Sequence, residues 1–432
     1  MSMKTHNFSR ISKAVSFGVY FLALNISLIA APLVQKGDRV AIVGDSITEQ
    51  KLYSKYMEAY LRVCSGVEDV KVFQYGWGGE RAEGFANRMM NDLAVFKPTV
   101  VTLCYGMNDG QYRPYTDDIG RYYEQNMRRV INGLKSMGVR TIIIGSPGAV
   151  DTKYFVRNNF APLSGAEGYN QNLAKLRDIC KKLAQEYNQP FANVHDALID
   201  AMKKAKAKYG DDYDVCGRDG IHPGPNGHLV MAYAFLKAMG FDGNIGEIVV
   251  DMKGKTSATG HKVVSSANGA ATIESQRYPL CFDPDPNLPS STRSILPFFP
   301  FNEDLNRFTL KVTNLSASKA KVKWGDQTKE FTRQQLEAGI NLAAEFPQTP
   351  FDENFQKILQ AIGAKQHFET VLIKNLVTNF RYFENERKND PEIDKAFNTL
   401  AEKLMKHHSE LDGEVTKLIT PITHKIEVIP TE

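Results

Sequence analysis

Four short stretches of the sequence hold a nucleophile, a base, a carboxylate and hydrogen-bond donors. Ser46 lies in GDSIT, Gly79 in GWGGE and Asn108 in YGMND, and Asp219 and His222 share DGIHP. A serine hydroxyl is a weak nucleophile until a positioned base removes its proton. Histidine commonly acts as that base, and a carboxylate holds it in the required tautomer. The set therefore contains what nucleophilic attack on an acyl group requires.

The spacing of these residues predicts a role for each. A step of three residues on one turn lets Asp219 accept a hydrogen bond from Nδ1 of His222, which we expect to deprotonate Ser46. The intermediate of acyl transfer carries negative charge on the former carbonyl oxygen, and preorganised donors stabilise it. We predict these donors to be the backbone N–H groups of Ser46 and Gly79 and the side-chain amide of Asn108. Glycine at position 79 would allow its amide to approach the oxyanion closely.

A pattern of alternating strands and helices is predicted to position these residues. Apolar, β-branched runs typical of strands buried on both faces occupy residues 40–43, 70–75, 99–105, 141–145 and 191–194. Helical spacing of apolar residues occupies 117–138, 165–188 and 226–239. The alternation predicts an α/β domain with a parallel sheet over residues 37–243. Sites in such sheets lie beyond the carboxyl ends of the strands, which is where three of the four stretches fall.

These four stretches, in this order, resemble the SGNH hydrolases, also called GDSL-type esterases and lipases. The resemblance covers about half of the chain. It implies a flavodoxin-like three-layer α/β/α fold, a catalytic Ser46, Asp219 and His222, and an oxyanion hole of Ser46, Gly79 and Asn108. Ile47 departs from the leucine that often follows the family's serine, which leaves the nucleophile unchanged.

Each stretch alone would also fit a structural role. Gly44-Asp45-Ser46 could be a helix cap, residues 78–79 a plain loop, and Asn108-Asp109 a turn that leaves a strand. His222 before Pro223 could stand at a helix entry without chemistry. Their joint occurrence at strand ends favours the catalytic interpretation.

Four aromatic and cationic residues near these stretches are predicted substrate contacts: Trp77, Arg81, Tyr105 and Tyr112. This mixture suits the faces and hydroxyl groups of sugars, although the same residues could simply shield the sheet edge. The expected function is an esterase acting on O-acyl, in particular O-acetyl, groups of carbohydrates. The alternatives are a lysophospholipase or general acyl-ester lipase, and a non-catalytic secreted carbohydrate-binding module.

The N-terminal residues 1–31 have the layout of a secretory signal. Lys4, Arg10 and Lys13 precede an apolar run over residues 14–31. Pro32 makes a cut after Ala31 unfavourable, and a run of this length just spans a bilayer, so an uncleaved membrane anchor is the alternative. Either way we expect a secreted or periplasmic protein, with membrane contact only through such an anchor.

Composition limits the other partners. The 432 residues carry a formal net charge of only +4 and no long basic block, so no nucleic-acid partner is expected. The five cysteines are scattered without CxxC spacing, and we expect neither a disulfide scaffold nor a metal site, and no cofactor.

The pattern changes after residue 243. Short alternating stretches separated by Gly, Ser and Asn predict a small antiparallel β-rich unit over residues 244–349, with a proline-rich connection or surface loop at 283–301. Helical periodicity returns over residues 350–422 and is interrupted at Asn389-Asp390-Pro391, which predicts a helical hairpin. The hairpin could bind a partner, or its apolar faces could simply pack on the sheet units.

Overall fold

The structure is a computed structural model that describes residues 32–155, 165–283, 285 and 288–432. The predicted signal or anchor at residues 1–31 lies outside the described residues. Within these ranges, no helix has the length and apolar character needed to cross a membrane.

A parallel sheet of five strands forms the centre of the N-terminal domain, with strand order β2-β1-β3-β4-β5. The strands are β1 (Arg39–Gly44), β2 (Lys71–Gly76), β3 (Val100–Cys104), β4 (Thr141–Gly145) and β5 (Phe191–Ala192). This order is flavodoxin-like and places the switch point between β1 and β3. The fifth strand is shorter than predicted, because the side chain of Asn193 caps the helix that begins at Val194.

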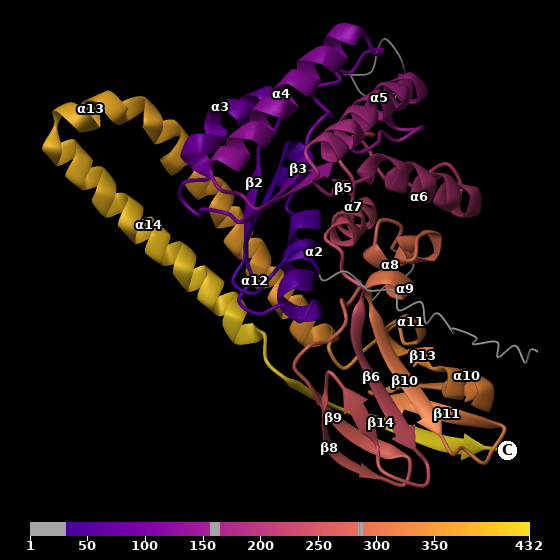
Figure 1. The fold of residues 1–432 in the computed structure, drawn as a ribbon. Helices are drawn as coiled ribbons and strands as arrows, with labels where there is room; N and C mark the ends of the chain where they lie inside the picture. Colours follow the sequence, from indigo (N-terminus) through magenta and orange to yellow (C-terminus); the bar gives the residue numbers. More distant parts are fainter. Residues whose placement is uncertain (1–31, 156–164, 284, 286–287) are drawn as a thin grey trace, which may run out of the picture. The chain divides into compact units, whose positions relative to one another are not determined.

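Helices cover both faces of this sheet (Figure 1). They are α1 (Ser46–Glu49), α2 (Tyr53–Ala59) with its extension η1 (Tyr60–Cys64), α3 (Ala82–Asp92), α4 (Asp117–Ser136), α5 (Gly165–Glu186), α6 (Val194–Tyr209) and α7 (Pro225–Ala238). Alternate residues of β1 enter two separate cores: Val40 and Ile42 pack in one, and Ala41 and Val43 in the other. The predicted three-layer α/β/α fold is confirmed.

Two sheets form the β-rich unit. One contains β6 (Asn244–Asp251), β7 (Ser257–Thr259), β10 (Arg307–Thr313) and β13 (Ile340–Asn341); the other contains β8 (Lys262–Ala267), β9 (Ala270–Ser275), β11 (Lys319–Trp324), β12 (Gln327–Thr332) and β14 (Ile422–Thr431). Phe308 of one sheet stacks on Trp324 of the other with ring centroids 5.7 Å apart. The predicted β-rich unit is confirmed, and its strand pairings are antiparallel except that β10 pairs with β6 in parallel. The long connection between these two strands frees them from hairpin geometry.

The proline-rich stretch is more ordered than the predicted loop. It contains α8 (Thr292–Ile295) and η3 (Leu296–Phe298), and α9 (Phe301–Leu305) follows directly. Ile295, Phe298 and Phe301 are buried, so this segment docks on the core through its apolar side chains. Two further short helices, α10 (Arg333–Ala338) and α11 (Leu342–Glu345), complete the unit.

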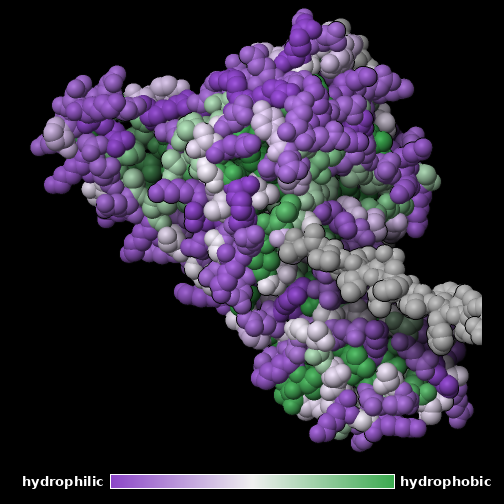
Figure 2. Space-filling model, in the orientation of Figure 1, coloured by the Kyte–Doolittle hydropathy of each residue, from purple (hydrophilic) through white to green (hydrophobic). Residues whose placement is uncertain are grey.

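The predicted helical hairpin is present. Helix α12 (Asp352–Val371) continues into η4 (Leu372–Thr378), followed by η5 (Arg381–Phe383), α13 (Glu384–Asn389) and α14 (Pro391–Leu418). Asp390 caps α14 by accepting backbone N–H groups of Glu392 and Ile393, which explains the break in periodicity. Figure 2 shows mostly hydrophilic residues over α13 and α14 in this view. Strand β14, which follows the hairpin, was not predicted.

The hairpin packs on the outermost strand of the parallel sheet. Nζ of Lys365, on α12, donates a hydrogen bond to the carbonyl oxygen of Val72 at 2.7 Å, and the N–H of Gln74 donates to Oε2 of Glu369 at 3.0 Å. These bonds satisfy backbone groups of β2 that an open sheet edge would expose. The C-terminal region therefore closes one edge of the N-terminal domain.

Candidate active site

Ser46 is the first residue of α1, directly after β1. Asp45 caps this helix: its Oδ1 accepts the N–H of Ile47 at 3.0 Å. Gly44 leaves room for the turn, because a Cβ there would lie 2.1 Å from Oγ1 of Thr48. Burial raises the pKa of Asp45 to about 7, against the opposing effect of the Ile47 hydrogen bond. The local sequence thus turns sharply and leaves the serine half-buried at the carboxyl end of the strand.

His222 and Asp219 lie in the loop before α7. Oγ of Ser46 is 2.8 Å from Nε2 of His222, and Nδ1 of His222 is 2.6 Å from Oδ2 of Asp219. The other carboxylate oxygen, Oδ1, accepts the N–H groups of Ile221 and His222, each at 2.9 Å. The structure therefore brings the three predicted catalytic side chains into one hydrogen-bonded chain.

The electrostatics of this chain favour proton acceptance by the imidazole. The hydrogen bond to Asp219 raises the pKa of His222 above its ordinary value of 6.5, against the opposing effect of burial. Burial alone would raise the pKa of Asp219, but the hydrogen bonds from His222 and from two backbone N–H groups lower it to about 2. The carboxylate therefore stays negative and stabilises an imidazolium ion beside it.

The loop that follows β2 lies against the turn that carries Ser46. The N–H of Trp77 donates to the carbonyl oxygen of Gly44 at 3.0 Å. Gly79 in this loop has a φ of +72°, a conformation that favours glycine. The loop that carries Gly79 therefore contacts the turn that carries Ser46.

Asn108 reaches the same loop from the end of β3. Its Nδ2 donates to the carbonyl oxygen of Glu80 at 3.0 Å, and its Oδ1 accepts the hydroxyl of Tyr112 at 2.9 Å. One proton of the amide is thus donated to the loop. Tyr112 fixes the orientation of the amide.

Of the other predicted substrate contacts, Trp77 and Arg81 line an open hollow of about 550 Å³. Its remaining lining comes from the loop, from α3 and from the hairpin: Gly78, Gly79, Glu80, Glu83, Gly84, Arg88, Thr378, Asn379, Arg381 and Tyr382. A second hollow, of about 480 Å³, is lined by His222, Arg218 and Pro289, among others. Each of the two hollows thus contains at least one predicted site residue.

Tyr105 does not belong to the site surface, which corrects the prediction that it contacts substrate. It is completely buried, and its hydroxyl donates to Oε2 of Glu80 at 2.6 Å. Glu80 also pairs with Arg88 at 2.7 Å. Tyr105 points into the core because it lies at the end of a strand whose side chains alternate between two buried faces.

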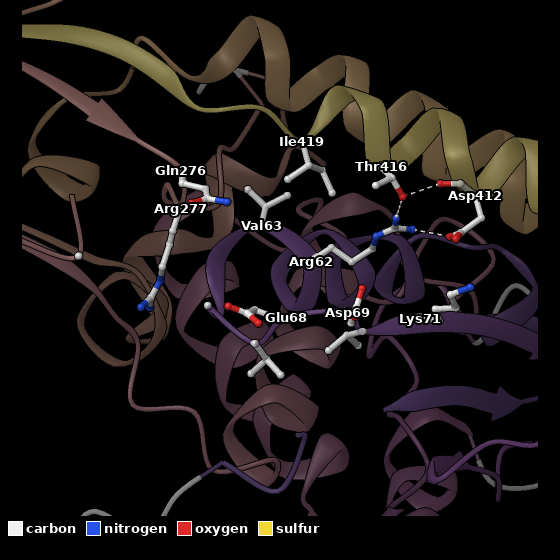
Figure 3. Close-up of a pocket in the computed structure, with 14 residues that line it drawn as sticks. Arg62, Val63, Glu68, Asp69, Lys71, Gln276, Arg277, Asp412, Thr416 and Ile419 are labelled. Atoms are coloured by element: carbon white, nitrogen blue, oxygen red, sulfur yellow. Dashed lines mark hydrogen bonds and ion pairs between the residues drawn. The ribbon is translucent and has the colours of Figure 1, made fainter. Parts of the chain in front are cut away.

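A further cavity, of about 420 Å³, lies between the start of β2 and α14 (Figure 3). None of the predicted site residues lines it. Figure 3 shows the guanidinium of Arg62 directed at Asp412 and Thr416, each at 2.7 Å. The guanidinium of Arg62 therefore binds two side chains of α14.

Sequence reasoning missed three residues that shape the site. Oδ1 of Asp109 accepts the N–H of Ala82 at 3.0 Å and so ties the end of β3 to the start of α3. Oε2 of Glu49 accepts the N–H of Gly78. Nζ of Lys374 lies 2.5 Å from Oε1 of Glu49. Asp109 is the last residue of YGMND and Glu49 directly follows GDSIT, so both could have been found there, whereas Lys374 has no local signal.

Comparison with known proteins agrees with this architecture. The sequence profile of the GDSL-like lipase/acylhydrolase family matches residues 42–230. An acetylxylan esterase from Geobacillus stearothermophilus is 22% identical over 230 residues, which cover 48% of this chain and 97% of that protein. The structure of a gut microbial diltiazem-metabolizing enzyme aligns with a TM-score of 0.72 at 22% identity, over 92% of this chain and 98% of that one. Residues 42–230 are therefore a domain of the GDSL-like lipase/acylhydrolase, or SGNH, family, and the protein is a carboxylic ester hydrolase.

Proposed function

We propose that this protein is an exported serine esterase that hydrolyses O-acyl esters of carbohydrates, in particular O-acetyl esters. The observation that carries the proposal is the continuous hydrogen-bonded chain from Oγ of Ser46 through the imidazole of His222 to Asp219. A hydroxyl held 2.8 Å from an imidazole nitrogen is in reach of general-base activation.

In the proposed reaction, Oγ of Ser46 attacks the carbonyl carbon of the ester while Nε2 of His222 takes the hydroxyl proton. The bond between that carbon and the sugar oxygen then breaks, and the imidazolium gives its proton to the departing oxygen. Water, deprotonated by His222, attacks the acyl carbon; the bond between that carbon and Oγ of Ser46 breaks, the imidazolium returns the proton to Oγ, and the carboxylic acid leaves. Asp219 remains ionised and holds Nδ1–H throughout.

Three donors would receive the negative charge of the tetrahedral intermediate. These are the N–H groups of Ser46 and Gly79 and the second amide proton of Asn108. Such donors act most strongly when they are fixed before the reaction begins. The bonds of Asn108 to Glu80 and Tyr112 support this preorganisation.

Two observations support a carbohydrate as the acyl acceptor. The hollow beside Gly79 presents Trp77 and Tyr382 together with Arg81 and Arg381, and aromatic faces and cationic donors suit sugar rings and their hydroxyl groups. The relative that matches the family domain is an acetylxylan esterase. An ester of a small acyl group with a sugar hydroxyl agrees with both the lining of the hollow and this relative.

An acyl-chain and acceptor profile tests the proposal. Hydrolysis of aryl acetate, butyrate and dodecanoate would be compared with release of acetate from acetylated xylan, using the wild-type protein, Ser46→Ala and the control Ser136→Ala. Ser136 is an exposed residue of α4 whose hydroxyl donates only to its own helix, to the carbonyl of Gly133. We expect acetyl esters to be preferred, and Ser46→Ala to lose on the order of 10⁶-fold in kcat.

The alternatives give different results. Activity confined to long acyl chains would replace the proposal by a lysophospholipase or lipase. Binding to insoluble glycans without any hydrolysis would favour a binding module. Export has its own test: residues 1–31 fused to a reporter should carry it out of the cytoplasm, and retention inside would contradict that part.

A further inference from the structure

The C-terminal hairpin reaches the proposed oxyanion loop through its π-helical segment η4. Thr378 of η4 donates to Oδ2 of Asp92 on α3 at 2.8 Å, and the carbonyl oxygen of Val377 accepts Nδ2 of Asn91 at 3.0 Å. π-Helical turns widen a helix locally and often occur at functional sites. This segment presents Lys374 to the loop of residues 77–79.

Lys374 contacts that loop in two ways. Its Nζ lies 4.8 Å from the ring centroid of Trp77, a cation–π distance. The same Nζ pairs at 2.5 Å with Oε1 of Glu49, whose Oε2 accepts the N–H of Gly78. The side chains of Lys374 and Glu49 are each only 25% exposed, so the pair is partly shielded from water. One chain of contacts therefore runs from the hairpin to the residue before Gly79.

We infer that Lys374 and Glu49 are positioning residues for the oxyanion hole, and that the hairpin is thereby a working part of the esterase site. This inference rests on the proposed function. An oxyanion donor is effective only when it points at the position of the developing charge, at about 2.7–3.1 Å. The loop that must supply this donor contains Gly78 and Gly79, and glycine leaves a backbone free to move.

The geometry explains why both residues are needed. Glu49 lies on α1, the helix that begins with Ser46, so its bond to Gly78 fixes the loop relative to the nucleophile. Lys374 holds the carboxylate in place and covers the Trp77 ring at the start of the loop. Removal of either contact would let the Gly79 amide drift while leaving Ser46, His222 and Asp219 in contact.

The test compares Lys374→Met with Lys357→Met in the full-length protein. Lys357 is on α12 of the same hairpin and makes an exposed ion pair at 2.6 Å with Glu353, one turn away on the same helix. We expect Lys374→Met to lower kcat about tenfold with KM changed less than about twofold, since the interaction acts on the transition state. Lys357→Met should match the wild-type protein in both constants, and Lys374→Arg should recover most of kcat.

Glu49→Gln and the double variant complete the design. Glu49→Gln keeps an acceptor for Gly78 but removes the ion pair, and should lower kcat by a similar factor at an unchanged melting temperature. The double variant should lose no more than about the larger single effect, because both changes break one chain of contacts.

Wild-type kcat in Lys374→Met and in Glu49→Gln, or full additivity of their effects, would overturn the inference. If Lys374→Met lowers the melting temperature, the kcat of Glu49→Gln is the deciding measurement: a lowered kcat supports the inference, and a wild-type kcat overturns it. Wild-type turnover in Ser46→Ala would instead refute the proposed function itself, so the two failures are distinguishable.

Discussion

The two sides of Ser46 are built in different ways. On the base side, Asp219 and His222 are three residues apart, and the Asp219 carboxylate accepts hydrogen bonds from residues 221 and 222. On the oxyanion side, the loop after β2 is held by Gly44, Asn108, Asp109 and Glu49, and through Glu49 by Lys374. The bonds between the carboxylate and the imidazole lie within one short turn, whereas the loop on the other side is held by several separate segments.

The base side therefore requires only that a carboxylate and an imidazole pair, whereas the other side requires that a backbone amide be held in a fixed direction. A turn of four residues can hold a carboxylate against an imidazole wherever the turn is placed. A backbone amide in a glycine-rich loop needs contacts from outside the loop to fix its direction. Changes on the base side should therefore act by removing a chemical group, and changes on the oxyanion side should act in graded steps.

The largest effect is expected on the base side. His222→Ala removes the base that is hydrogen-bonded to Ser46 and should lower kcat on the order of 10⁶-fold. The control is His407→Ala, an exposed histidine of α14 that should leave kcat unchanged. The measurement is steady-state hydrolysis of an aryl acetate, and substantial turnover in His222→Ala would show that another base serves Ser46.

Asp219→Asn should come next, with kcat lowered about 10⁴-fold. The amide keeps the size of the side chain but loses the negative charge that stabilises the imidazolium. The same assay applies, with circular dichroism to confirm that the loop before α7 remains folded. A loss below tenfold would mean that the base side does not depend on its carboxylate.

Asn108→Ala tests the oxyanion side and should lower kcat about 10²- to 10³-fold, since it deletes one donor. Tyr112→Phe is the matched variant, because it removes only the hydroxyl that orients the amide. It should lower kcat by a few-fold, in keeping with loss of a single neutral hydrogen bond. Equal effects from both variants would contradict the graded behaviour expected of this side.

The last prediction is a pH dependence of the wild-type activity. His222 must be neutral to accept the serine proton, so kcat/KM should fall tenfold per pH unit below its pKa, which Asp219 raises above 6.5. In Asp219→Asn this acidic limb of the kcat/KM profile should move to lower pH, because the interaction that stabilises the charged imidazole is lost. Profiles from about pH 5 to 9 check this, and an unmoved limb would assign it to another group.

The fold of residues 37–243 was largely predictable because its signals are local. The strand over Thr141–Gly145 was predicted at its observed bounds, and buried β-branched runs separated by amphipathic helices specify a parallel sheet. The C-terminal half was less predictable. The parallel pairing of β10 with β6 and the insertion of β14 between β11 and β9 join segments far apart in sequence, which no local pattern encodes.

The candidate site divides in the same way. Residue types and order indicated Ser46, Gly79, Asn108, Asp219 and His222, and the structure brings these segments together. Tyr105 was misplaced because an aromatic residue beside a motif has the same sequence signature whether it points outward or into the core. Export and the carbohydrate acceptor stay predictions.

The sequence by itself determined the chemistry: a serine, an imidazole and a carboxylate in family order, and the βα units that carry them to one sheet edge. Only the tertiary structure decided that Lys374 meets Glu49 across 325 positions of the chain, and that α12 closes the edge of β2. The physical reason is the separation along the chain over which each interaction acts. Helix and strand periodicity act over a few residues, whereas ion pairing and edge capping depend on which surfaces meet after the chain has folded.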